Sequence, residues 1–267
     1  MKITSKIYPI IILCLSAISF VACEKVIELD LKNTEPKLVI EANFTDSLQI
    51  QTVNIGQTVS FKSDNKMTPV SNAQVSLKSD NGLALSFVEI APGFYATNKA
   101  VKGIAGIKYT LTVTVNNQTY TAISQMPSPV KIDSLKQTSI VIFGKTNKFI
   151  QVVYNDEPGV PNYYNNRFYV NKIKRNDSFV EFDRFNDGKR VENTLFNQEP
   201  DLKTGDKVKV ELLGIDVNVY RYLFAIAQIN GAGGPPTSPA DPDSNFSNGA
   251  LGYFSSTAIS VDSVIVK

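Results

Sequence analysis

Paired carboxylates are the residues of this 267-residue chain whose type and spacing come closest to chemistry. Asp183 and Asp187 flank a hairpin, with Asp187 itself in the Asn-Asp-Gly turn at 186–188; they can form an acid/base pair or stabilise the turn, and the turn is favoured. Asp241 and Asp243 alternate like the oxygen ligands of a calcium loop, but Phe246 stands where that loop needs glycine. A solvated turn is therefore favoured there, and the sequence predicts no catalytic, cofactor or metal site.

Aromatic and amide side chains supply a candidate binding surface. Tyr163, Tyr164 and Asn166 open an expected strand after a Pro-Gly-Val-Pro turn. Exposed Tyr and Asn can stack on and hydrogen-bond a sugar or a peptide; the favoured interpretation is that alternate tyrosines enter the core while the asparagines complete the turn. The chain has no Trp, which removes the strongest platform for sugar stacking. The candidate contact surface consists of Tyr163, Tyr164, Asn166, Asp241 and Asp243.

Composition excludes several function classes. The chain has no histidine, which excludes Ser-His-Asp and Cys-His catalysis, His-ligated zinc and His-based proton transfer. It has neither a nucleophile-elbow motif nor a phosphate-loop motif. The net charge is only +2 and no basic stretch is present, so nothing favours nucleic acid as a partner. We therefore expect a non-enzymatic protein.

The first 23 residues predict export and lipidation. Two lysines precede an apolar run from Ile7 to Ala22, which ends at Cys23. This order is typical of a secretory signal peptide, and a small residue directly before Cys resembles the lipobox of bacterial lipoproteins. An ordinary signal peptide and a transmembrane helix are the alternatives, but the run is short for crossing a bilayer. We expect residues 1–22 to be removed and Cys23 to carry lipid, which leaves no cysteine pair for a disulfide.

Short strands account for most of the remaining chain. In Ile107–Val115 apolar and polar residues alternate, as in a strand with one buried face. Many such runs, separated by turns, predict antiparallel sandwiches. The other expected strands are 37–44, 50–61, 119–124, 132–143, 148–155, 163–175, 179–185, 207–215 and 258–266. Hairpin turns are expected at 80–82 and 186–188.

Stretches rich in Pro and Gly predict where the domains and the helix begin and end. Pro127-Ser128-Pro129 is the expected boundary between a first sandwich and a second β-rich domain. One helix is expected near 218–230, with Asn218 as its cap and Gly231 at its end, followed by a polar loop at 231–248. The expected organisation is a leader (1–22), a lipidated Cys with its tether (23–36), a first domain (37–128) and a second domain (129–267).

Several motifs together resemble one family. They are the stretches at 23–31 and 35–42, Pro-Gly-Phe-Tyr at 92–95, and the closing Ser-Asn-Gly-Ala-Leu-Gly-Tyr-Phe at 247–254. They are similar to the DUF4249 lipoproteins of Bacteroidota, over essentially the whole chain after Cys23. The resemblance implies a first domain like the immunoglobulin-like, carboxypeptidase-regulatory-like modules attached to TonB-dependent transporters.

The same resemblance implies a location and a partner. It points to the outer membrane, with the lipid on Cys23 as the anchor and a TonB-dependent transporter as the partner. Glu24 is followed by Lys25-Val26-Ile27, which is not the acidic cluster of surface-exported lipoproteins, so both faces of the membrane stay open. Two alternatives also stay open: a stand-alone adhesin that binds glycans or peptides, and a hydrolase that uses a pair of carboxylates.

Overall fold

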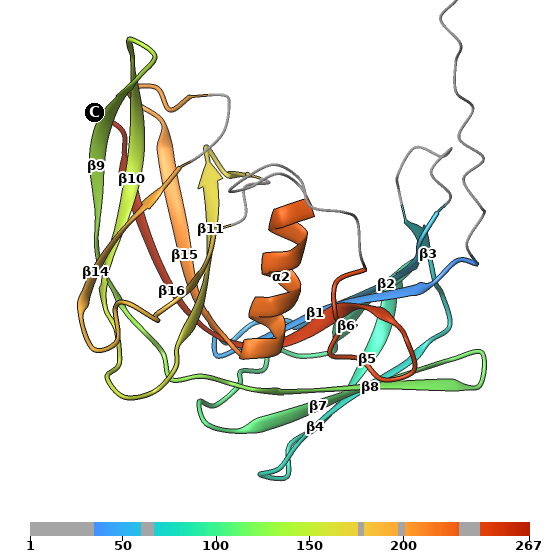
Figure 1. Ribbon diagram of the computed structural model, residues 1–267. Helices are drawn as coiled ribbons and strands as arrows, with labels where there is room; N and C mark the ends of the chain where they lie inside the picture. Colours follow the sequence, from blue (N-terminus) through green and yellow to red (C-terminus); the bar gives the residue numbers. More distant parts are fainter. Residues whose placement is uncertain (1–34, 60–66, 176–178, 197–200, 230–240) are drawn as a thin grey trace, which may run out of the picture. The chain divides into compact units, whose positions relative to one another are not determined.

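The computed structural model describes residues 35–59, 67–175, 179–196, 201–229 and 241–267 (Figure 1). Most of its strands form where apolar and polar residues alternate. In β7 (Lys108–Val115) the apolar residues of the alternating pattern are all buried, as the sequence predicts. The other strands of the N-terminal half are β1 (Leu38–Thr45), β2 (Thr52–Gln57), β3 (Thr68–Pro69), β4 (Gln74–Ser79), β5 (Ala84–Ala91), β6 (Phe94–Thr97) and β8 (Gln118–Gln125). The turn expected at 80–82 joins β4 to β5.

The C-terminal half is also mainly β, so the expected fold class is confirmed at this level. Its strands are β9 (Ile132–Ile142), β10 (Lys145–Asn155), β11 (Tyr163–Val170), β12 (Ile173–Lys174), β13 (Phe179–Phe182), β14 (Arg190–Leu195), β15 (Lys207–Ile215) and β16 (Leu251–Ile265). The strand expected at 163–175 is divided into β11 and β12, because Asn171 and Lys172 form a turn with positive φ. The strand expected at 258–266 begins earlier, at Leu251.

The expected helix is α2 (Val217–Ile229), and its cap differs from the prediction. The Oδ1 atom of Asp216 accepts hydrogen bonds from the backbone N–H groups of Asn218 and Val219, at 2.9 and 3.1 Å. Asp216 is therefore the N-cap, and Asn218 already lies in the first turn. Gly231 and the first part of the expected loop lie outside the described residues. No helix in the described part of the chain is long and apolar enough to cross a membrane.

One long path of hydrogen-bonded strands runs through both halves. Its order is β12-β11-β15-β16-β1-β2-β6-β5-β4-β7-β8, and a separate sheet has the order β14-β10-β9. Residues 35–267 form one compact unit. Its N-terminal half has a core around Phe44, Tyr95 and Leu111, and its C-terminal half has another around Phe168 and Val210. Two separate cores thus share one continuous run of strands.

The strand β16 joins the two cores. Its residues 251–257 pair in parallel with β1, and its residues 258–265 pair antiparallel with β15. Phe254 in its first part belongs to the N-terminal core, whereas Val264 in its second part packs on the C-terminal core. The chain therefore returns at its end to complete a core that its first strand began.

A glycine permits the closest approach in this junction. Gly252 has a φ of +92°, and a Cβ atom built on it would overlap the carbonyl oxygen of Ile40 in β1. Any side chain would therefore meet both a steric clash with rigid backbone and a strained conformation. The glycine in the Leu-Gly-Tyr-Phe motif is required by the parallel pairing of β16 with β1.

We expect Gly252→Ala to lower the free energy of unfolding by about 3 kcal/mol or more, since backbone strain and separation of β1 from β16 add together. Gly249→Ala is the matched control. Gly249 also has a positive φ, of +74°, but a Cβ there would meet nothing within 4 Å, so we expect a loss of about 1 kcal/mol. Urea denaturation measures both. Equal losses would show that the approach to Ile40 is unimportant.

Candidate functional site

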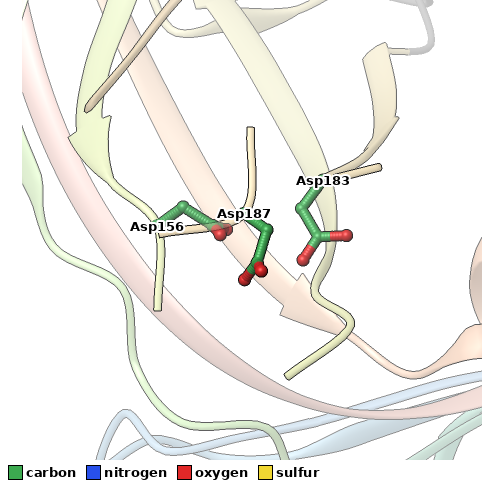
Figure 2. A group of neighbouring side chains, drawn as sticks. All are labelled: Asp156, Asp183 and Asp187. Atoms are coloured by element: carbon green, nitrogen blue, oxygen red, sulfur yellow. The ribbon is translucent and has the colours of Figure 1, made fainter. Parts of the chain in front are cut away.

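Three carboxylates meet at one end of the C-terminal half (Figure 2). Asp156 follows β10, Asp183 follows β13, and Asp187 lies in the turn before β14. One oxygen atom from each lies within 4.8 Å of the others. Asp156 and Asp183 are buried, with 5% and 6% of their surface exposed, whereas Asp187 is exposed. We call these three residues the Asp cluster.

Hydrogen bonds from neighbouring turns hold the Asp cluster in place. Asp156 accepts hydrogen bonds from the Tyr164 hydroxyl at 2.6 Å and from the backbone N–H of Gly188 at 3.0 Å. Asp183 accepts one from the backbone N–H of Asn162 at 2.8 Å, and Asp187 accepts one from that of Gly159 at 2.7 Å. These carboxylates thus tie together the loop before β11 and the turn before β14.

The electrostatics of the Asp cluster are unfavourable. Burial raises the pKa of Asp183, and the negative charges of Asp156 and Asp187 raise it further, against the hydrogen bond from Asn162. The ion pairs among the described residues include none of the three carboxylates. Closely spaced carboxylate oxygens are the ligands that a hard cation such as Ca²⁺ takes. Such a cation would relieve the repulsion, and Asp156, Asp183 and Asp187 are the residues that could hold it.

The structure changes the interpretation of Asp183 and Asp187 in one respect. Both stabilise a turn, as the sequence favours, but they also meet Asp156, which the sequence analysis did not single out. Asp156 is 27 positions away from Asp183 in the sequence, and only the pairing of β11 with β13 and of β10 with β14 brings them together. An Asp at the end of a strand, just before a Pro-Gly turn, was the available signal.

The carboxylate spacing also bears on the hydrolase alternative. A structure in which no two carboxylates lie within about 10 Å would have excluded a hydrolase. The carboxylates of the Asp cluster lie within that distance, so the hydrolase alternative is not excluded on this ground. Glycosidases, however, hold a sugar between carboxyl groups about 5 to 9.5 Å apart. The oxygens of the Asp cluster are closer than this, and two of its three members are buried. This geometry suits a cation better than it suits a sugar.

A fourth carboxylate, Glu181, lies between the two sheets of the C-terminal half. It accepts hydrogen bonds from the amide groups of Asn166 (2.6 Å) and Asn193, and its other oxygen lies 3.4 Å from the Tyr154 hydroxyl. Burial raises the pKa of Glu181 to about 7, although these three neutral donors oppose the rise. Register places Glu181 opposite Tyr164, so it lies on the same face as the tyrosine that binds Asp156.

The structure does not gather the predicted contact residues into one surface. Tyr164 and Asn166 are 2% and 1% exposed, so they are removed from any contact surface; they face the core because β11 alternates. Tyr163 is half-buried and stacks on Phe182 with ring centroids 4.9 Å apart. Buried Tyr164 agrees with the interpretation in which alternate tyrosines enter the core, whereas Asn166 lies buried within β11 and does not complete the turn.

The two aspartates of the predicted surface lie elsewhere. Asp241 forms an exposed ion pair with Lys37 at 2.5 Å. Asp243 lines a cavity of about 600 Å³ beside α2 and β8, together with Asn218 and Arg221. Cys23, the predicted lipidation site, lies outside the described residues.

Glu181 makes stability depend on pH. The pKa of Glu181 is raised from 4.5 to about 7 in the folded chain. The protonated carboxyl group therefore contributes most to the free energy of unfolding below pH 4.5, and this contribution is lost as the pH rises to about 7. We expect Glu181→Gln to remove this loss of about 3 kcal/mol, so that the variant is more stable than the native chain at pH 8. Urea denaturation at pH 5 and pH 8 measures the difference.

Glu192→Gln is the control for this experiment. Glu192 is exposed and pairs with Lys136 at 2.6 Å, and this partner lowers its pKa. The contribution of Glu192 to the free energy of unfolding therefore falls as the solution becomes more acidic, whereas the contribution of Glu181 rises. A native chain whose stability does not fall between pH 5 and pH 8 relative to Glu181→Gln would contradict the buried, proton-binding state of Glu181.

Asp187→Asn tests the repulsion within the Asp cluster. The variant keeps an oxygen that can accept from Gly159 and removes one of the two negative charges that raise the pKa of Asp183. With a chelator present at pH 7, we expect a Tm equal to or slightly above that of the native chain, and a gain that disappears at acid pH. A clear loss of Tm would contradict net repulsion. A Tm that rises with Ca²⁺ only in the native chain would identify the cluster as a cation site.

Comparison with known proteins supplies a family for this architecture. The profile of the family described as "Domain of unknown function (DUF4249)" matches residues 24–262. No curated protein matches the chain. Among solved structures, the chain is similar to a DUF4785 family protein from Legionella pneumophila subsp. pneumophila str. Philadelphia 1, with 8% identity and a TM-score of 0.25. That match covers 68% of this chain and 54% of the Legionella protein, so the chain spans about half of its length, and so weak a likeness carries no argument. The chain belongs to the DUF4249 family.

Proposed function

We propose that this protein is a non-enzymatic lipoprotein of the outer membrane that serves as an accessory to a TonB-dependent transporter. It would capture a ligand for the transporter or bind the transporter directly. The observation that carries the proposal is the apolar leader that ends in Ala22-Cys23, followed by a chain of the DUF4249 family. Lipid on Cys23 would attach the protein to a bilayer of a Bacteroidota cell.

The reach of the anchor is compatible with a partner in the same membrane. Cys23 lies 15 residues before Leu38, where β1 begins. A chain of this length spans at most about 50 Å. The folded unit would therefore stay close to any transporter beside it. The same limit on the reach of the tether applies at either face of the membrane.

We also propose the finer architecture that the family resemblance implies. Residues 37–128 would correspond to an immunoglobulin-like, carboxypeptidase-regulatory-like sandwich, and residues 129–267 to a second sandwich-like domain. Two separate cores support this division. The N-terminal core also includes Phe246, Ala250 and Phe254 from the C-terminal half. The first sandwich would therefore need these three residues to complete its core.

Co-purification tests the proposed partnership. We expect the affinity-tagged, lipidated protein, extracted from native envelopes in mild detergent, to recover a TonB-dependent transporter. Cys23→Ser is the matched control, and it should lose both palmitate incorporation and the transporter. Recovery of the lipoprotein alone, with palmitate incorporated, would contradict the accessory role and leave the anchor intact.

A stand-alone adhesin is the second candidate, and one observation favours it. The cavity of about 600 Å³ beside α2 is lined by polar side chains, including Asp243 and Arg221. Arg221 forms no ion pair with any described residue, so its charge is available to a ligand. Tight binding of the protein on a glycan or peptide array, lost in Arg221→Ala, would favour this function over the transporter partnership.

A further inference from the structure

The hairpin of β9 and β10 ends in exposed apolar side chains. Val141, Ile142 and Phe143 are 67%, 39% and 105% exposed. The partner strand β14 pairs with β10 only from Ile150 onward, so the end of the hairpin extends past it as two strands (Figure 1). Single exposed apolar residues are ordinary, but three in succession at the end of a hairpin call for a partner. We call residues 141–144 the hairpin tip.

The backbone of the hairpin tip shows that Phe143 does not serve the fold. Phe143 and Gly144 have φ angles of 49° and 77°, and they connect two paired strands. Such a two-residue turn favours Asn-Gly, because both positions need positive φ. A bulky aromatic residue is disfavoured there, and a fully exposed one gains nothing from burial. Phe143 is therefore unfavourable in the isolated chain on both counts.

Lysines surround the same end of the molecule. Lys145 pairs with Asp201, and Lys148 donates hydrogen bonds to Thr204 and to the carbonyl of Lys267, so the base of the hairpin lies beside the turn before β15. Two cavities in turn join that region with the turn after β11. The lysines are Lys145, Lys148, Lys172, Lys203, Lys207, Lys209 and Lys267. Among the described residues, the acidic side chains in these ion pairs and cavities are Asp201, Asp206 and Glu211, and they are outnumbered by the lysines. We call this region the lysine-rich end.

Part of that positive charge has no ion-pair partner among the residues that the structure describes. Lys145 and Lys209 pair with Asp201 and Glu211. Lys172 and Lys207 form no ion pair with any described residue, and both line a cavity of about 420 Å³. Ile265, which is 56% exposed, adds apolar surface to the same cavity. The lysine-rich end thus combines apolar surface with cations, as surfaces that bind anionic lipid do.

The size of the hairpin tip favours a bilayer over a protein as its partner. Three side chains offer roughly 400 Å² of apolar surface, whereas a stable protein interface needs about 800 Å² from each partner. A narrow apolar tip needs no matching pocket to enter lipid. We propose that the hairpin tip inserts into the bilayer that carries the lipid anchor, with the lysine-rich end against anionic headgroups.

Insertion of the hairpin tip rests on the proposed membrane attachment, and it would fix the orientation of the protein on the bilayer. The Asp cluster follows the opposite end of β10 from the hairpin tip, and 11 residues of strand separate them by about 35 Å. Insertion of the tip would therefore hold the carboxylates away from anionic headgroups. A lipid on a tether allows any orientation, and the hairpin tip would select one.

The absence of Trp from the chain permits a direct test. The full, acylated protein is prepared as Phe143→Trp, and as Phe185→Trp for the control. Phe185 is also exposed, at 77%, but it lies at the end of the molecule that holds the Asp cluster. In phosphatidylglycerol–phosphatidylcholine vesicles, we expect the Trp of Phe143→Trp to shift to the blue and to be quenched by brominated acyl chains. The Trp of Phe185→Trp should do neither, and equal exposure of both to water would overturn the proposal.

Two further variants and a control separate lipid binding from folding. For Phe143→Asn we expect an unchanged or higher Tm, because Asn suits the turn, together with a fall of about 10- to 100-fold in vesicle affinity of the non-acylated chain. Lys172→Glu should weaken binding to anionic vesicles only, and Lys78→Glu, an exposed lysine of β4, should not. A Tm lowered by Phe143→Asn, or unchanged affinity, would contradict the proposal.

Flotation distinguishes failure of this inference from failure of the proposed function. Vesicle flotation of the acylated protein reports on the lipid at Cys23, and quenching reports on the hairpin tip. A protein that floats with an unquenched Trp at position 143 retains its anchor and lacks the insertion. Crosslinking of position 143 to an envelope protein, without quenching, would assign the hairpin tip to a protein partner and overturn the lipid interaction.

Discussion

The parallel pairing of β16 with β1 is the interaction on which the rest of the structure depends. It places the end of the chain beside its first strand, and the second part of β16 then pairs with β15. Each core receives side chains from this one strand. Because the pairing needs Gly252 to lie against the carbonyl of Ile40, a single backbone position connects the two cores.

Polar groups reinforce the same junction. Asp216, which caps α2, also bonds the hydroxyl of Ser124 in β8, and this hydroxyl accepts the backbone N–H of Ser256 at 2.8 Å. Burial raises the pKa of Asp216, while the bonds from Ser124 and from the helix N-terminus act against the rise. A helix cap, an edge strand and the central strand thus meet at one carboxylate, so the start of α2 is tied to both cores.

The C-terminal half has different chemistry at its two ends. Acidic side chains gather where β10 and β13 end, and lysines gather around the base of the hairpin that begins β10. The interior between these ends is apolar except for Glu181 and its amide neighbours. Exposed apolar residues lie at the lysine-rich end, which gives that end the character of a lipid-facing surface, whereas the acidic end suits cations.

Local pattern was sufficient to predict several elements, and long-range pairing decided the others. The alternation in Ile107–Val115, the strand at 207–215 and the helix near 218–230 follow from residue periodicity, as does the mainly β class. The Asp cluster could not be predicted, since Asp156 meets Asp183 only through pairing of strands distant in sequence. Tyr164 and Asn166 were candidates for a contact surface because periodicity does not say which face of β11 meets a core. The sequence by itself determined most of the strands and the helix, because these depend on neighbouring residues, and its export and lipidation signal at Cys23 stays a prediction. Only the tertiary structure decided how the halves join and where charges gather, because both depend on contacts between residues far apart in the chain.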